Sequence, residues 1–117
     1  MSAVLHAPSE TAVGRECPCP ECMALFVPTQ PGQLFCTAAH RAAWNNRATV
    51  RGRVLTPLAI VARLTRNGTR GDRKTGQSAG HHANTLILRW RDEDREAGRM
   101  PWEDYLARRY RLGFDPL

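Results

Sequence analysis

The sequence is poor in lysine, in aromatic residues and in long hydrophobic runs. No stretch approaches the roughly 18 consecutive apolar residues of a membrane-spanning helix, so we expect no membrane span. The N-terminus lacks a basic region followed by an apolar run, so we expect no signal peptide and a cytoplasmic location. Thiols stay reduced there, and clustered cysteines then favour a metal site over disulfides.

The chain offers little material for a large hydrophobic core. It has 117 residues, of which 42% are hydrophobic, but many of these are alanines and only 7% of the chain is aromatic. Burial alone stabilises a domain of this size only marginally. We therefore expect a single small domain, with or without tails, to which a metal ion or a partner adds stability.

The positive charge is concentrated in the middle of the chain. The net charge is +6, and arginine outnumbers lysine sixteen to one. Residues 47–83 carry seven arginines and one lysine against one aspartate, whereas residues 84–117 balance seven arginines with seven acids. The excess can therefore act as a local patch.

Three cysteines and a histidine form the pattern Cys19-x2-Cys22-x13-Cys36-x3-His40. Four such ligands suit tetrahedral Zn²⁺. The first pair fits a tight turn whose N–H groups bond to the first sulfur. The second pair, at i and i+4, fits the first turn of a helix whose positive end lies near the Cys36 thiolate. Because four protein ligands leave no position for water, the pattern predicts one structural Zn²⁺ ion, and we expect no enzyme.

Cys17 is an alternative to Cys19 as the first ligand. We prefer Cys19, because a Cys17–Cys22 pair would place Pro18 and Pro20 in a four-residue gap and remove two N–H donors from the turn. Cys17 is then a free thiol, an exchangeable fourth ligand or incidental.

Two short motifs carry a family resemblance. Cys19-Pro20-Glu21-Cys22 and Phe35-Cys36-Thr37-Ala38-Ala39-His40-Arg41 resemble the short bacterial FCS-type zinc fingers, and in this respect the zinc-binding DNA gyrase inhibitors. The resemblance covers residues 17–47 only. It implies a treble-clef or zinc-ribbon-like finger in a bacterial or phage protein, with Cys19, Cys22, Cys36 and His40 at the ligand positions. The sequence departs from the pattern in three places, since His40 replaces the last cysteine, Thr37 replaces serine and Met23 stands where glycine is common.

The N-terminal half of the sequence predicts a flexible tail followed by the finger. Residues 1–14 have no clear periodicity and are expected to be mobile. In the finger, residues 15–55, the apolar stretch 24–27 and a loop at 29–33 predict a β-hairpin. A helix follows Cys36 and is expected to end at about Arg51, near Gly52.

Residues 56–117 predict a helical unit. Thr56 and Pro57 would begin a helix that Asn67-Gly68 ends, with its apolar body packed in the core. The glycine-rich segment 68–83 is expected to be a flexible basic loop. A helix is then predicted from Thr85 to Ala97, stopped by Gly98, and another is opened by Pro101. The fold class is therefore small α+β, mostly α, in which a zinc finger (β-hairpin plus helix) precedes about three helices.

The basic middle of the chain favours nucleic-acid binding. Exposed arginines can contact phosphates, and Asn or Arg near a groove can bond to base edges. We therefore predict a DNA-associated regulator that binds through the finger helix and the following loop. The predicted nucleic-acid-binding residues are Arg41, Asn45, Arg47, Arg51, Arg53, Arg70, Arg73 and Lys74.

Two other functions have some support. Aromatic residues among arginines suit a protein interface, which predicts an adaptor or inhibitor of a DNA-handling or transcription enzyme such as a polymerase or topoisomerase. These aromatic residues are Trp90, Trp102, Tyr105, Tyr110 and Phe114, although for Trp90 and Trp102 a place in the core is the preferred interpretation. The run His81-His82-Ala83-Asn84 suggests a nuclease site, but no predicted strand supports it, and we disfavour this interpretation.

Overall fold

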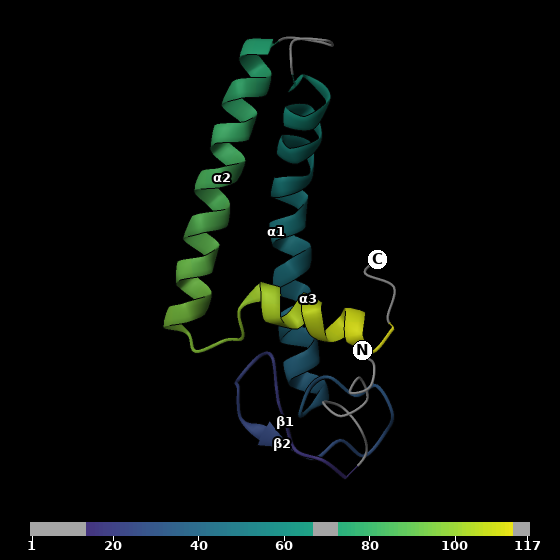
Figure 1. The fold of residues 1–117 in the computed structure, drawn as a ribbon. Helices are drawn as coiled ribbons and strands as arrows, with labels where there is room; N and C mark the ends of the chain where they lie inside the picture. Colours follow the sequence, from purple (N-terminus) through teal and green to yellow (C-terminus); the bar gives the residue numbers. More distant parts are fainter. Residues whose placement is uncertain (1–13, 67–72, 114–117) are drawn as a thin grey trace. The chain divides into compact units, whose positions relative to one another are not determined.

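The computed structural model describes residues 14–66 and 73–113. Two short strands, β1 (Cys17–Pro18) and β2 (Leu25–Phe26), precede three helices, α1 (Ala38–Leu64), α2 (Arg73–Glu96) and α3 (Trp102–Arg111), as Figure 1 shows. This confirms the predicted fold class, a small, mostly helical α+β chain with a hairpin before the helices. Most of the predicted tail lies outside the described residues.

The chain divides into two compact units. Of the described residues, unit 1 contains 14–44 and 94–113, and unit 2 contains 45–66 and 73–93. The predicted boundary at residues 55–56 falls inside α1, which runs through it without a break.

The hairpin turns earlier than its apolar pattern predicted. β1 and β2 are antiparallel, with Cys17 opposite Phe26 and Pro18 opposite Leu25, so residues 19–24 form the turn. The Met23 N–H donates to the Cys19 carbonyl at 2.7 Å, and the Cys19 N–H donates to the Ala24 carbonyl at 3.0 Å. The predicted hairpin loop at 29–33 is a separate turn with no strand between it and α1. Its assignment was wrong because the cysteine turn itself reverses the chain.

Helix α1 is one 27-residue helix where the sequence predicted two. Gly52 does not end the first, and Pro57 lies inside α1 where it was expected in the opening turn of a second helix, capped by Thr56. Proline in a helix interior removes one hydrogen bond and costs about 3 kcal/mol. Contacts with α2 lie on both sides of Pro57, because Arg51 pairs with Glu93 and Ala62 lies next to Gly80.

Helix α2 begins at Arg73, twelve residues before the predicted start at Thr85. Residues 73–83 are therefore helical, which contradicts the predicted flexible loop over that part; residues 68–72 lie outside the described residues. The glycines and alanines of this segment are spaced at three and four residues, and Gly76, Ala79 and Ala83 are buried. They form a face of α2 that packs against another helix, although the composition of this segment is typical of a loop.

In unit 2, the two helical segments run antiparallel and side by side (Figure 1). Arg51 lies over the Trp90 ring at 5.4 Å, and near the other end a Cβ added to Gly80 would lie 3.6 Å from the Ala62 Cβ. A Cβ added to Gly76 would coincide with the Thr65 hydroxyl, so the backbones approach closely there. Small residues of α2 permit this close approach.

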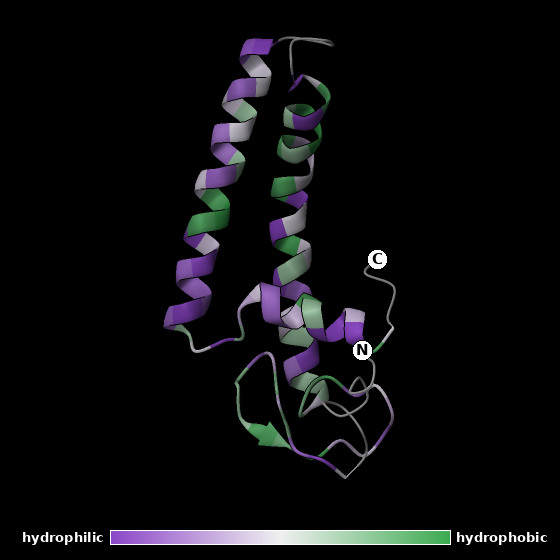
Figure 2. Cartoon of the chain, in the orientation of Figure 1, coloured by the Kyte–Doolittle hydropathy of each residue, from purple (hydrophilic) through white to green (hydrophobic). Residues whose placement is uncertain are grey.

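The apolar side chains of residues 58–64 were expected in the core, and this was wrong for several of them. Ile60 and Leu64 are more than half exposed, and Val50 and Val54 are also exposed. Figure 2 shows the apolar residues along this part of α1. Only one residue of α1, Trp44, is fully buried.

Unit 1 has an aromatic core. Trp44 packs against Trp102 and Tyr105 with ring centroids 4.6 and 4.9 Å apart, and Phe35 lies 6.0 Å from Trp44. The buried cluster consists of Cys19, Leu34, Phe35, Trp44, Met100 and Tyr105. Gly98 ends the turn after α2 with φ 75°, and Pro101 precedes α3, as predicted. The core of unit 1 therefore includes the first cysteine of the metal-ligand pattern.

Candidate metal centre

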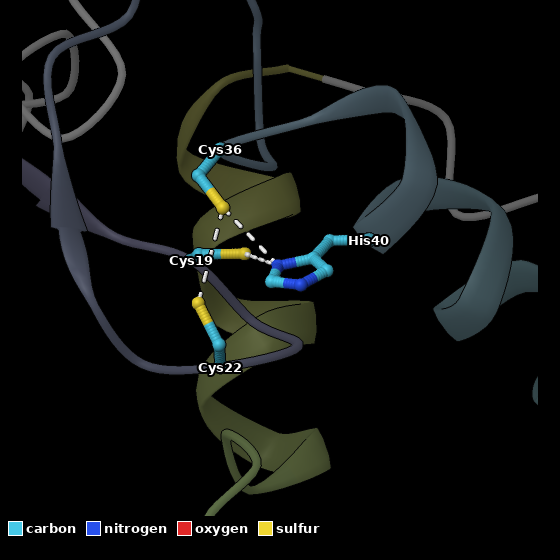
Figure 3. Close-up of side chains that lie close together, drawn as sticks. All are labelled: Cys19, Cys22, Cys36 and His40. Carbon is cyan, nitrogen blue, oxygen red and sulfur yellow. Dashed lines mark hydrogen bonds between the residues drawn. The ribbon is translucent and has the colours of Figure 1, made fainter.

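The four predicted ligands converge on one point in unit 1 (Figure 3). The ligand atoms of Cys19, Cys22, Cys36 and His40 all lie within 4.8 Å of one another. The Cys22 and Cys36 sulfurs are 3.8 Å apart, and His40 Nδ1 lies 3.9 Å from the Cys19 sulfur and 3.1 Å from that of Cys36. A tetrahedral ion with ordinary zinc bond lengths would require about 3.8 Å between sulfurs and about 3.6 Å between sulfur and nitrogen. The residues therefore fit a single tetrahedral metal ion.

The turn between β1 and β2 supplies the first pair. Cys19 is fully buried, and burial raises the pKa of its thiol, but hydrogen bonds from the backbone of Cys36, Cys22 and Glu21 and from the His40 side chain outweigh this. The net effect lowers the pKa of Cys19 to about 7. Backbone donors therefore favour the Cys19 thiolate, the form that binds a metal, as the turn was predicted to do.

The start of α1 supplies the second pair. The Thr37 hydroxyl accepts a hydrogen bond from the His40 N–H at 3.1 Å, which is the geometry of a helix N-cap and fixes the turn that carries the imidazole. The pKa of the Cys36 thiol is raised to about 11, first by burial and then by the neighbouring Cys19 and Cys22 thiols. Cys36 therefore depends on a metal ion to displace its proton.

Cys17 lies outside the group. It is buried in β1, and burial raises the pKa of its thiol, with Arg108 acting in the opposite direction. Within residues 14–66 and 73–113, Cys19, Cys22, Cys36 and His40 form the one cluster able to hold a metal ion. Thiolate and imidazole donors suit zinc and other soft or borderline ions rather than Mg²⁺ or Ca²⁺.

The predicted nucleic-acid-binding residues do not share one environment. Arg41, Asn45, Arg53, Arg73 and Lys74 are exposed, Arg47 and Arg51 are partly buried, and Arg70 lies outside the described residues. Arg51 donates to Glu93 at 3.3 Å and covers the Trp90 ring, so its side chain is only 11% exposed. Arg51 therefore stabilises unit 2 instead of presenting its charge to solvent.

The other candidate residues are distributed through the fold. His81, His82 and Asn84 are exposed on α2 and do not belong to the metal-ligand cluster. Tyr105 and Trp102 pack in the aromatic core, whereas Tyr110 is 58% exposed. Phe114 lies outside the described residues.

Sequence reasoning missed several residues that organise unit 1. Thr37 caps α1, and its position before a run of helix formers could have indicated this role. Asp94 is buried and accepts hydrogen bonds from Arg99 Nε at 2.9 Å and from Trp102 Nε1 at 3.2 Å. Arg108 is buried and donates from Nη1 to the Pro18 carbonyl at 2.9 Å. Nothing in their local sequence distinguishes Asp94 and Arg108 from surface charges.

Comparisons with protein-family models, with curated proteins and with solved structures give no match for this chain. The resemblance to FCS-type fingers therefore stays a prediction that rests on the two motifs. None of the helices in the described residues is long and apolar enough to cross a membrane.

Proposed function

We propose that Cys19, Cys22, Cys36 and His40 hold one structural Zn²⁺ ion and that the chain is a small DNA-associated regulator acting through α1. The convergence of three sulfurs and one imidazole nitrogen within 4.8 Å supports the metal. This donor set is one that zinc takes in closed structural sites. The metal would contribute on the order of 10 kcal/mol to folding, and we assign it no catalytic role because protein ligands fill all four positions.

One observation supports nucleic-acid binding above the others. Helix α1 contains five arginines and no acidic residue, and its first turn carries the ligand His40. A metal-fixed helix loses little conformational entropy on docking, and its exposed arginines can displace counterions from a phosphate backbone. Of the predicted DNA-binding arginines on α1, Arg41 and Arg53 are exposed, whereas Arg47 is partly buried and Arg51 is engaged by Glu93.

The test is fluorescence anisotropy of the zinc-loaded protein with a random-sequence DNA duplex. Affinity should fall steeply between about 50 and 200 mM salt, and each lost phosphate contact should reduce the salt slope by about 1. The double variant Arg41→Ala/Arg53→Ala should therefore bind more weakly and with a smaller slope.

The matched control removes the same charge from α2. Arg89 and Arg91 are exposed, but they lie in the charge-balanced part of the chain. The double variant Arg89→Ala/Arg91→Ala should bind DNA nearly as the wild type does. Equal losses in the two double variants, or no binding at low salt, would count against α1 as a DNA-binding surface.

A second candidate function is a protein-binding adaptor for an enzyme such as a polymerase or topoisomerase. The exposed apolar residues Val50, Val54, Ile60 and Leu64 on α1 favour it, because clustered exposed apolar groups mark interaction surfaces. Capture of such an enzyme that survives Arg41→Ala/Arg53→Ala but is lost on Val54→Ser/Ile60→Ser would support this function over DNA binding.

A further inference from the structure

A buried arginine lies beside the metal centre. Arg108, on α3, is only 2% exposed, although an arginine is almost never fully buried without a partner of opposite charge. Its Nη1 donates to the carbonyl of Pro18, the residue that precedes ligand Cys19. Removing a guanidinium from water costs several kcal/mol unless charge and hydrogen bonds compensate for the loss.

Arg108 lies next to the turn that carries Cys19. Burial lowers the pKa of Arg108, and the neighbouring groups Cys17, Cys19 and Asp104 act in the opposite direction. Asp104 is exposed on the same helix, and Cys17 is not among the metal ligands. The hydrogen bond to the carbonyl of Pro18, next to ligand Cys19, therefore connects Arg108 to the metal centre.

The net charge of the loaded centre matches that of the guanidinium. Three thiolates and a neutral imidazole around a divalent ion carry a net charge of −1, and this charge is largely shielded from water on the Cys19 side. A single adjacent +1 group neutralises it.

We propose that Arg108 is the buried counter-charge of the metal–thiolate centre and couples metal binding to the docking of α3. This inference rests on the proposed zinc site. Arg108 is a positioning residue and binds no metal itself. The coupling is reciprocal. If the metal-loaded centre stabilises the docked position of α3, then docking of α3 increases the affinity of the centre for the metal by the same factor.

A second hydrogen bond joins the same two segments of unit 1. The Met100 N–H, just before α3, donates to the Pro20 carbonyl at 2.9 Å. The carbonyls on both sides of Cys19 therefore accept hydrogen bonds from residues 100–108. These bonds fix Arg108 close to the ligand turn, so a change of charge at the centre acts on it at short range.

The test is a double-mutant cycle between Arg108 and the charge of the centre. Zinc affinity is measured by competition with a chromophoric chelator, and the Co²⁺ spectrum checks that each centre is four-coordinate. Arg108→Met should weaken zinc binding by about 10–100-fold, as for other residues that support metal ligands. Arg108→Lys keeps the charge and should retain most of the affinity, and Arg111→Met, at an exposed position of α3, should bind as the wild type does.

The second arm of the cycle changes the ligands. Cys22→His replaces the exposed cysteine and makes a neutral Cys2His2 centre, in which Arg108→Met should cost only a few-fold. His40→Cys makes a centre of charge −2, in which the same substitution should cost more than in the wild type. Equal penalties in all three backgrounds, or equal losses for Arg108→Met and Arg108→Lys, would overturn the proposal.

If Arg108→Met does not fold, the proposal can still be tested in proteins that keep Arg108. In hydrogen exchange of the zinc-loaded proteins, α3 should exchange faster in Cys22→His than in the wild type, while residues 73–90 of α2 are unchanged. Unchanged protection of α3 would overturn the proposal. Failure of the wild type to bind zinc would instead refute the proposed metal centre, so the two failures are distinguishable.

Discussion

At the scale of single residues, Met23 marks a conflict between side chain and backbone. It has φ 61°, the left-handed conformation that normally suits glycine, and it is the one such non-glycine residue in the described part of the chain. The position closes the turn that carries Cys19 and Cys22, where glycine is common in the fingers this sequence resembles. Left-handed backbone costs a residue with a Cβ about 1–2 kcal/mol.

Met23→Gly should therefore stabilise the zinc-loaded protein. Glycine removes the steric cost but adds about 0.5–1 kcal/mol of unfolded-state entropy, so we expect the free energy of unfolding to rise by about 0.5–1 kcal/mol. Denaturant titration followed by tryptophan fluorescence measures it. Ala24→Gly, at the next position, lacks a positive φ and should destabilise the protein. A variant Met23→Gly no more stable than the wild type would show that the turn tolerates methionine at no cost.

At the scale of helices, Gly76 and Gly80 have opposite requirements although both lie on α2. A methyl group at Gly76 would overlap the Thr65 side chain, whereas one at Gly80 would make an ordinary contact with Ala62. We expect Gly76→Ala to destabilise the protein by about 1–3 kcal/mol through overpacking. We expect Gly80→Ala to stabilise it by up to about 1 kcal/mol through helix propensity. Thermal unfolding followed by circular dichroism compares the two, and a similar effect of both would contradict the close packing of unit 2.

These glycines also show what the sequence could and could not predict. The ligand set, the end of α2 near Gly98 and the start of α3 after Pro101 follow from local rules of spacing and capping, and they were predicted. The start of α2 and the continuity of α1 were not predicted. Gly76, Gly80 and Pro57 disfavour helix locally, and their helical state accompanies contacts between separate segments, such as that of Gly80 with Ala62.

In the candidate site, too, features set by local sequence were predicted and features set by long-range contacts were not. Cys19, Cys22, Cys36 and His40 could be selected because metal ligands obey short-range spacing rules. The roles of Asp94 and Arg108 arise from contacts over long sequence separations, such as that between Arg108 and Pro18. Arg51 could not be separated from the exposed arginines for the same reason, since Glu93 and Trp90 lie about forty residues away in the sequence.

At the scale of the whole molecule, zinc-dependent stability should fall as the solution becomes more acidic. The pKa of the free Cys36 thiol is about 11 and the bound form is a thiolate, so binding releases its proton at any pH near neutrality. The metal lowers the effective pKa of its ligands, and the stability it adds is therefore present at higher pH and lost as the pH falls. Because Cys36 releases one proton on binding, this residue alone should lower the zinc affinity about tenfold for each unit by which the pH falls. Chelator competition between pH 8 and about 6 measures this, and a constant affinity would contradict thiolate ligation.

The division of the chain into units has a consequence for the order in which the protein can assemble during synthesis. Unit 2 is contiguous, but unit 1 combines residues 14–44 with residues 94–113. A ribosome therefore produces all four metal ligands long before Tyr105 and Arg108, which complete the surroundings of Cys19. The early ligands can bind an ion, but its buried side and its counter-charge are added last. Pairing of Arg51 with Glu93 brings the two ends of unit 2 together and shortens the loop that unit 1 must close, which lowers the entropic cost of that final step.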